Sequence, residues 1–298
     1  MDTKRKSPRH SVATVVLLSS CLVAGTAFAT GTPCGCDTKV VVKKFYDANA
    51  NGIWNAGEPG LTNWQMTLES TTTSFSSTKF TSWGGIASWK PVAPGGYTLR
   101  EGTPIQTNWV QSSPVDANGD PINPQSLTAR AGKTTTVKFG NYCKVGSGGR
   151  TAGFWSNKNG AARMADNLSS EPELQMLRDL NLVDADGMDF DPTNHAQLSA
   201  WLRDRNANNM AFQLSGHLAA MALNVEAGFV RGNATFLPFE GTINELMLMA
   251  DQSLDANPQT FVGHPERAYQ EQLKNYLDAL NNNAAVVSPK PCKRSFAY

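Results

Sequence analysis

The chain has almost no net charge, few histidines and no recognised catalytic motif. Its 298 residues include 26 basic and 25 acidic side chains, and only four histidines. Without an excess of Lys and Arg, nucleic acid is not an expected partner. No HExxH helix, phosphate-binding glycine loop or Gly-x-Ser-x-Gly turn occurs, so the motifs of zinc proteases, nucleotide hydrolases and serine hydrolases are absent. The sequence therefore predicts a protein that is not an enzyme.

Long hydrophobic runs are also missing, except at the N-terminus. A basic stretch in residues 4–9 precedes the apolar run Val12–Val23, and Ala27-Phe28-Ala29 forms a small-x-small cleavage site. This pattern is typical of a secretory signal peptide over residues 1–29. A lipoprotein signal, in which Cys21 is lipidated, is the alternative. No later run approaches the length of a membrane span, so we expect an extracellular or cell-surface protein without a transmembrane segment in the mature chain.

Cysteine is scarce as well. Of the five cysteines, Cys21 belongs to the predicted signal peptide, which leaves Cys34, Cys36, Cys143 and Cys292. An even number in an exported chain favours disulfide bonds. Because Cys34 and Cys36 are too close in sequence to pair comfortably with each other, we expect one of them to bridge to Cys143 and the other to Cys292. A metal site made by the four thiolates is the alternative.

Residues 38–143 have the period-two pattern of β-strands. Turn sequences such as Pro94-Gly95-Gly96 separate the alternating runs. This spacing predicts an all-β sandwich. The residues expected on one face of each strand are Trp64, Met66 and Leu68; Tyr97, Leu99 and Glu101; and Val137, Phe139 and Asn141.

A different pattern follows this half. Residues 144–150 form a small, Gly-rich linker, and apolar residues then recur at helical spacing through residues 151–283. Ser170 and Glu173 have the spacing of a capping box at the start of one helical stretch. The sequence therefore predicts a multidomain chain, with an all-α domain over residues 151–283 and a C-terminal tail over residues 284–298.

The segment Asp47–Glu58 matches the spacing of a calcium-binding loop, D-x-[DN]-x-[DN]-G-x5-E. Calcium is a hard cation that takes about six to eight oxygen ligands. Gly52 permits the sharp turn within the loop. The expected ligands are the side chains of Asp47, Asn49, Asn51, Asn55 and Glu58, together with the carbonyl oxygen of Ile53.

The sequences on either side of this loop do not suit an EF-hand. A Val-rich run enters the loop, and Pro59-Gly60 prevents a helix from leaving it. We therefore expect the loop between strands. Only two of the expected side-chain ligands are charged, which predicts a dissociation constant of about 0.1–1 mM. An Asx-rich turn without metal is the alternative.

Motifs throughout residues 38–143 resemble, in the same order, the B-type repeat of bacterial serine-aspartate-repeat surface proteins. They are Lys44-Phe45-x-Asp47-x-Asn49-x-Asn51-Gly52, Gly57-Glu58-Pro59-Gly60-Leu61, Trp64, Pro94-Gly95-Gly96-Tyr97-Thr98, Trp109-x-Gln111-x-Ser113-Pro114 and Phe139-Gly140-Asn141-Tyr142. The resemblance implies an all-β sandwich of the immunoglobulin-like or prealbumin-like type, which calcium stiffens and which serves as a spacer or stalk in adhesion. One copy is present rather than an array, which argues against a long stalk.

Related B-type domains of collagen adhesins carry a covalent bond between Lys and Asn side chains, promoted by a Glu. This resemblance implies counterparts in Lys44, Glu101 and Asn141. If their strand faces form the core, a neutral, desolvated Lys44 can attack the amide of Asn141 while Glu101 shuttles protons. An ordinary hydrogen-bonded trio, or three exposed strand ends, is the alternative.

Two segments of the helical half resemble a region found beside such repeats in bacterial surface proteins. They are Arg150-Thr151-x-Gly153-Phe154-Trp155-x-Asn157 and Leu214-x-x-His217-Leu218-x-Ala220-x-x-Leu223-Asn224. The resemblance favours secretion and implies no chemistry.

Three further groups of residues are weaker candidates for sites. The histidines His195, His217 and His264 lack metal-binding spacing, so we expect them to be isolated. The acidic stretches Asp184–Asp191 and Asp116–Asp120 read first as solvated turns. A sugar-stacking platform is an alternative to core packing for the tryptophans Trp54, Trp64, Trp83, Trp89 and Trp109.

Together these features predict a secreted or cell-surface structural protein of the adhesin type, with a sandwich stabilised by Ca²⁺. The expected partner is extracellular matrix, a glycan or another surface protein. One alternative is a module that binds glycan or protein through exposed aromatic residues. Another is a secreted hydrolase with its site in the helical half, because pairs of catalytic acids have no sequence signature.

Overall fold

The computed structural model describes residues 37–166 and 169–297. All of these residues belong to one of the two units of the chain, residues 34–298. The predicted signal peptide, the lipidation candidate Cys21 and the cysteines Cys34 and Cys36 lie outside the described residues.

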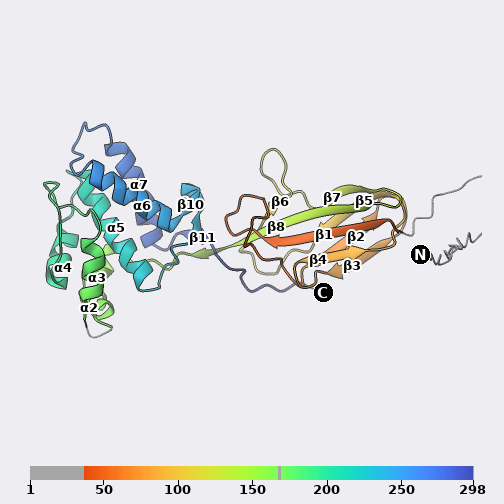
Figure 1. Cartoon of the computed structure of the whole chain (residues 1–298), viewed down its shortest axis with the longest axis horizontal. Coiled ribbons are helices and arrows are strands. Elements are labelled where there is room, and N and C mark those ends of the chain that lie inside the picture. Colours follow the sequence, from red (N-terminus) through yellow and green to blue (C-terminus); the bar gives the residue numbers. More distant parts are fainter. Residues whose placement is uncertain (1–36, 167–168, 298) are drawn as a thin grey trace, which may run out of the picture. The chain divides into compact units, whose positions relative to one another are not determined.

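The first half of the described chain is a sandwich of two β-sheets (Figure 1). One sheet places β1 between β4, which is antiparallel to it, and β8, which is parallel to it, and β6 pairs with β8. The other sheet has the order β3-β2-β5-β7 and is antiparallel throughout. The strands are β1 (Lys39–Tyr46), β2 (Gln65–Ser70), β3 (Ser76–Phe80), β4 (Ile86–Trp89), β5 (Gly95–Glu101), β6 (Trp109–Ser113), β7 (Gln125–Ala129) and β8 (Thr134–Gly146).

The alternation read from the sequence defines the core between the two sheets. Trp64, Met66 and Leu68 are completely buried, as are Leu99 and Phe139. Val-rich β1 suits a strand that is covered on its inner face, since β-branched residues pack well on a pleated surface. The predicted sandwich is therefore confirmed.

The second half is mainly helical, as predicted. α5 is buried nearly all round and packs against α1, α3, α6 and α7, which makes it the central helix of this half. No helix among residues 37–166 and 169–297 is long and apolar enough to cross a membrane. The helices are α1 (Ala152–Trp155), α2 (Lys158–Met164), α3 (Glu171–Arg178), α4 (His195–Asp204), α5 (Met210–Glu226), the 3-10 turn η2 (Leu237–Phe239), α6 (Ile243–Ala256) and α7 (Arg267–Asn281).

The predicted helix start at Ser170 is confirmed, but the predicted capping box is not formed. Ser170 is the N-cap of α3 but makes no side-chain capping bond, and Glu173 is buried instead of reaching back to the cap. Burial of the first turn of α3 against the helical core overrides the local capping pattern.

The boundaries between the regions differ from those read in the sequence. β8 continues to Gly146, inside the predicted linker 144–150, and pairs with β11 (Ala285–Val287), inside the predicted tail. Two short strands, β9 (Thr235–Phe236) and β10 (Gly241–Thr242), extend this pairing within the helical half. The linker and the tail thus stabilise each other through backbone hydrogen bonds. A strand of three residues is too short for its periodicity to be recognised in the sequence.

The C-terminal tail returns to the sandwich and is attached there by a disulfide between Cys143 and Cys292, whose Cα atoms are 6.2 Å apart. The expected pairing of Cys143 and Cys292 with Cys34 and Cys36 is therefore wrong. The antiparallel pairing of β11 with β8 brings the tail past Cys143, and the Ser288 N–H donates to the Cys143 carbonyl. A pairing set by this return path cannot be deduced from sequence spacing.

Candidate functional site

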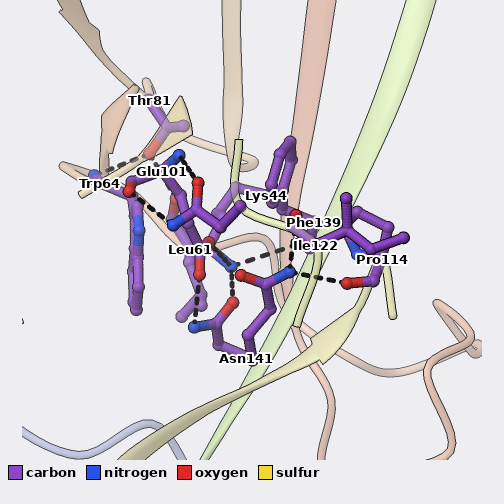
Figure 2. Close-up of polar contacts among 11 residues, drawn as sticks. Lys44, Leu61, Trp64, Thr81, Glu101, Pro114, Ile122, Phe139 and Asn141 are labelled. Carbon is purple, nitrogen blue, oxygen red and sulfur yellow. Dashed lines mark hydrogen bonds and ion pairs between the residues drawn. The ribbon is translucent and has the colours of Figure 1, made fainter. Parts of the chain in front are cut away.

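Three polar side chains from two sheets meet inside the sandwich. Lys44 lies on β1, Asn141 lies on the neighbouring parallel strand β8, and Glu101 ends β5 in the opposite sheet. Their exposed fractions are 0%, 3% and 5%, respectively. Figure 2 shows the three side chains converging on one point. The alternative of exposed strand ends is thus excluded, and the trio is in the core.

The contacts among the three side chains connect each one to the other two. The Lys44 Nζ donates to the Asn141 Oδ1 and lies 2.9 Å from the Glu101 Oε2. The Asn141 Nδ2 donates to the other carboxylate oxygen, Glu101 Oε1, at 3.0 Å. One carboxylate therefore bridges the amine of Lys44 and the amide nitrogen of Asn141 (Figure 2).

The surroundings of Lys44 favour its neutral form. Burial lowers the pKa of Lys44 from 10.5 to about 8, although the nearby charge of Glu101 acts in the opposite direction. The Lys44 Nζ also lies 4.4 Å from the centre of the Trp64 ring. Loss of water around an ammonium group disfavours its charged state, which is why burial outweighs the ion pair here.

This arrangement has the parts that amide exchange requires. The Lys44 Nζ is a nucleophile beside the amide group of Asn141, and Glu101 contacts both the attacking and the departing nitrogen. A positioned base of this kind can move a proton between the two nitrogens without diffusion. The trio is therefore chemically competent to join the side chains of Lys44 and Asn141.

The segment Asp47–Glu58 follows β1 directly and begins beside this trio. Asp47 is buried, and its backbone N–H donates to the Asn141 carbonyl at 3.0 Å. Its carboxylate accepts the N–H groups of Asn51 at 3.1 Å and Gly52 at 2.7 Å. Gly52 has a φ of +75°, a conformation that glycine adopts without steric cost. The first half of the segment is thus a tight turn around one buried carboxylate.

The end of the segment folds back onto its start. The Glu58 carboxylate accepts the N–H of Ala48 at 2.9 Å and the N–H of Asn55 at 2.8 Å. The amide oxygens of Asn49 and Asn51 each accept a backbone N–H within the turn. Ile53, whose carbonyl is an expected ligand, is exposed at the surface of the loop.

These oxygens suit a hard cation of modest affinity. Each carboxylate oxygen of Asp47 and Glu58 that accepts one N–H retains a lone pair for a metal ion. The other side-chain oxygens that could bind the ion are the amide oxygens of Asn49, Asn51 and Asn55. No cluster of three or more His, Cys, Asp or Glu side chains that could hold a metal occurs in the described part of the chain. A calcium ion here would depend on two carboxylates supplemented by neutral oxygens.

The five tryptophans do not share one exposed face. Trp64 and Trp89 are buried in the core, so the proposed sugar-stacking platform is wrong as a set. Trp54 stacks on Phe45 with ring centres 5.4 Å apart, and Trp109 packs edge-on against Trp64. Trp83, which is 94% exposed, is the exception. Rings that pack inside the protein are not available to stack on a sugar.

The acidic stretches are turns, as expected. The Asp184 Oδ1 accepts the N–H groups of Asp186 and Met188. The Asp116 Oδ1 likewise accepts the N–H groups of Asn118 and Asp120. Each stretch therefore uses its first carboxylate to cap a turn.

The three histidines belong to separate local environments. His195 contacts the Trp155 carbonyl at 2.8 Å, and the His264 Nδ1 accepts the Glu266 N–H. Burial, followed by the nearby Arg205, lowers the pKa of His217 to about 4. Each histidine thus has its own set of neighbours in the described residues.

Asn224, the buried last residue of the second resembling segment, connects the two resembling segments of the helical half. The Asn224 Oδ1 accepts the Arg150 N–H at 2.9 Å and the Trp155 indole N–H at 3.2 Å. Its Nδ2 donates to the Arg150 carbonyl and to the Asn281 Oδ1. Asn224 is therefore a structural node, and the conspicuous Gly-Phe-Trp segment docks on it rather than forming a site of its own.

Comparisons with known proteins give weak likenesses to solved structures over about a third of the chain. No protein-family model matches the sequence. No curated protein matches it. Among solved structures, the TIE protein of Bacillus anthracis is 17% identical, with a TM-score of 0.25, over 36% of this chain and 17% of that chain.

Two pilins give similar values. The minor pilin GBS52 of Streptococcus agalactiae is 13% identical, with a TM-score of 0.25, over 35% of this chain and 43% of that one. The shaft pilin SpaA of Lactobacillus rhamnosus GG is 15% identical, with a TM-score of 0.25, over 35% of this chain and 48% of that one. The chain thus spans less than half the length of each of these three proteins, and at such scores the likeness does not extend to activity or partners.

Proposed function

We propose that this protein is an exported, non-catalytic structural protein of the bacterial surface whose sandwich is locked by a covalent bond between Lys44 and Asn141. The observation that carries the proposal is the buried trio, in which Glu101 contacts the nitrogens of both partners. The sequence resemblance to B-type adhesin domains and the disulfide-bonded C-terminal tail support a role outside the cytoplasm.

The reaction is an amide exchange within one chain. The neutral Lys44 Nζ attacks the Asn141 Cγ, and a new C–N bond forms. Glu101 takes a proton from Nζ and passes it to Nδ2, the Cγ–Nδ2 bond breaks, and one molecule of ammonia leaves. Glu101 ends the reaction as the carboxylate that it was at the start, so atoms and charge balance without an added reactant.

The position of the bond suits a protein that bears load. It would join β1, the first strand of the sandwich, to β8, the strand that leads into the helical half. The two residues are separated by 97 positions, so the bond would close nearly the whole sandwich into one covalent ring. Force that enters through β8 would then reach β1 through covalent bonds instead of backbone hydrogen bonds alone.

Calcium at Asp47–Glu58 is the second part of the proposal. The oxygens of Asp47, Asn49, Asn51, Asn55 and Glu58, with the Ile53 carbonyl, would hold the ion. Because the loop leaves β1 and its Asp47 N–H bonds to the Asn141 carbonyl, an ion in this loop would stiffen the end of the sandwich nearest the cross-link.

Intact mass measurement tests the proposal. The natural chain is expected to weigh one ammonia less than its sequence requires, in addition to the change from its disulfide. The variants Lys44→Met, Glu101→Gln and Asn141→Ala should each have the full mass that their own sequence requires, with no ammonia lost. They remove the nucleophile, the proton carrier and the electrophile, respectively.

Lys43→Met is the matched control. Lys43 neighbours Lys44 on β1 but is only partly buried and lies on the opposite face of the strand. This variant should still lose ammonia. A natural chain that keeps its full mass after folding, with its disulfide formed, would refute the covalent bond.

A further inference from the structure

The last ten described residues of the chain lie across the sandwich beside the trio. Ile105 donates its N–H to the Ser295 carbonyl, and the Trp109 indole N–H donates to the Lys293 carbonyl at 3.2 Å. Phe296 is only 7% exposed and packs edge-on against Trp64, with ring centres 5.4 Å apart. We call residues 288–297 the strap. Its backbone is bonded to the sandwich at several positions, so it is part of that domain although it follows the helical half in sequence.

One cation of the strap, Arg294, lies against the two tryptophan rings next to the trio. The Arg294 guanidinium carbon lies 5.3 Å from the centre of the Trp64 ring and 5.7 Å from the centre of the Trp109 ring. The same Trp64 ring receives the Lys44 Nζ at 4.4 Å. The Arg294 Nη2 also donates to the Thr62 carbonyl, which fixes the position of the head group.

This placement has an electrostatic consequence for Lys44. A fixed positive charge nearby disfavours an ammonium ion and so favours the free amine, the form that attacks an amide. The charge of Arg294 does lower the pKa of Lys44, whereas the charges of Glu101 and Asp47 raise it. Of these three neighbours, Arg294 alone promotes the nucleophile.

We propose that the strap completes the cross-linking centre, with Arg294 as a positioning residue that acts on Lys44 through Trp64 and with the Cys143–Cys292 disulfide holding the strap in place. The inference rests on the proposed bond between Lys44 and Asn141. It adds that the bond forms fastest once residues 288–297 have docked, because Arg294 reaches the Trp64 ring beside Lys44 only after the strap has returned to the sandwich.

The disulfide suits this holding role by its position. Cys143 is two residues from Asn141 on β8, and Cys292 is two residues from Arg294 on the strap. The bond therefore links the strand that supplies the electrophile to the segment that supplies the cation. A covalent link of this kind raises the local concentration of the strap at its docking surface.

The test follows the reaction in the full chain. Chains recovered unfolded in denaturant, with intact mass confirming that ammonia is still present, are diluted into a glutathione redox buffer at several pH values. Samples are quenched in acid over time, and the fraction that has lost ammonia is read from the mass spectrum. Circular dichroism at the end of each time course checks that the variant has folded.

Arg294→Gln should move the pH profile of the rate to higher pH. Loss of the positive charge should raise the pKa of Lys44, which leaves less free amine at pH 7, and the rate there should fall about threefold. Arg294→Lys should restore the natural profile, because it returns the charge. Lys293→Gln, which removes a charge from the exposed neighbouring position of the strap, should react like the natural chain.

A second variant pair tests the holding role. Cys143→Ala with Cys292→Ala should slow the loss of ammonia roughly tenfold, because the strap then docks without its covalent link. If this variant does not fold, the charge variants at position 294 still decide the outcome.

Two results would overturn the inference in distinguishable ways. A natural chain that folds without losing ammonia removes the proposed bond and the role of the strap together. A natural chain that loses ammonia, while Arg294→Gln has the same pH profile and rate, leaves the bond standing and removes the strap from the reaction.

Discussion

The sandwich and the helical half bury polar side chains for different purposes. In the sandwich, Lys44, Glu101 and Asn141 bring a nucleophile, a base and an electrophile into contact. In the helical half, Asn224 is equally buried but makes four hydrogen bonds to groups that cannot react with it. Burial of polar groups alone therefore does not indicate chemistry; the identity and contacts of the buried groups do.

The two regions also keep their shape by different means. The helical half depends on an apolar core around α5, and the side-chain hydrogen bonds of Asn224 hold the first helical segment against it. The sandwich has an apolar core of its own, and in addition a disulfide at Cys143 and the proposed bond at Lys44. Loss of the cross-link, a lower pH and removal of calcium should therefore each change the stability of one region more than that of the other. The expected effects are given from the largest to the smallest.

The largest expected effect is the loss of the proposed cross-link in Asn141→Ala. A covalent link that closes a ring of about 100 residues contributes roughly 4–5 kcal/mol in the chain-entropy account. The free energy of unfolding of the sandwich should fall by about that amount, while the helical half should be affected far less. Denaturant unfolding followed by hydrogen exchange of each region measures both. An equal loss in the two regions would contradict the separation, and Lys43→Met serves as the control.

The second effect is acid sensitivity of the helical half through His217. Burial lowers the pKa of His217 from 6.5 to about 4, against the raising effect of Asp278 and with the lowering effects of Arg205 and Lys274. The unfolded chain therefore binds a proton that the folded chain does not, between about pH 6.5 and pH 4. The contribution of His217 to stability should be constant above about pH 6.5 and should fall as the pH drops through this window, by about 3 kcal/mol.

His217→Leu should flatten this part of the pH dependence. Urea unfolding of the helical half at a series of pH values gives the measurement. His264→Leu is the control, because His264 lies in a separate loop, where its Nδ1 accepts the Glu266 N–H. A variant at position 217 that keeps the full acid sensitivity would show that other groups are responsible.

The smallest effect concerns calcium and the sandwich. With a dissociation constant of about 1 mM, calcium at about 10 mM should stabilise the sandwich by about 1.4 kcal/mol, and chelation should remove the gain. Glu58→Gln should abolish most of the response, whereas Asp116→Asn, in a turn elsewhere on the sandwich, should leave it unchanged. Thermal unfolding with calcium or chelator measures this, and identical curves would exclude the ion.

Local patterns in the sequence predicted much of the sandwich, whereas the members of the trio came from the resemblance to B-type adhesin domains. Strand alternation placed Glu101 with Leu99, and Asn141 with Phe139, on faces that the structure buries. Such patterns work because side-chain direction in a strand is fixed by position.

What the sequence did not predict depends on long-range return of the chain. The pairing of Ala285–Val287 with β8 and the contact of Arg294 with Trp64 join positions separated by more than a hundred residues. Three apolar residues in a row and one arginine carry no local signal of such contacts. The disulfide was assigned wrongly for the same reason, since the path of the tail determines which cysteines meet.

The central claim is that Lys44 and Asn141 are joined, and one peptide tests it most directly. Proteolysis of the folded, purified chain, followed by reduction and fragmentation mass spectrometry, should yield a branched peptide in which the segment containing Lys44 is attached to the segment containing Asn141, with one ammonia lost at the junction. Recovery of the two segments as separate linear peptides of full mass would contradict the account.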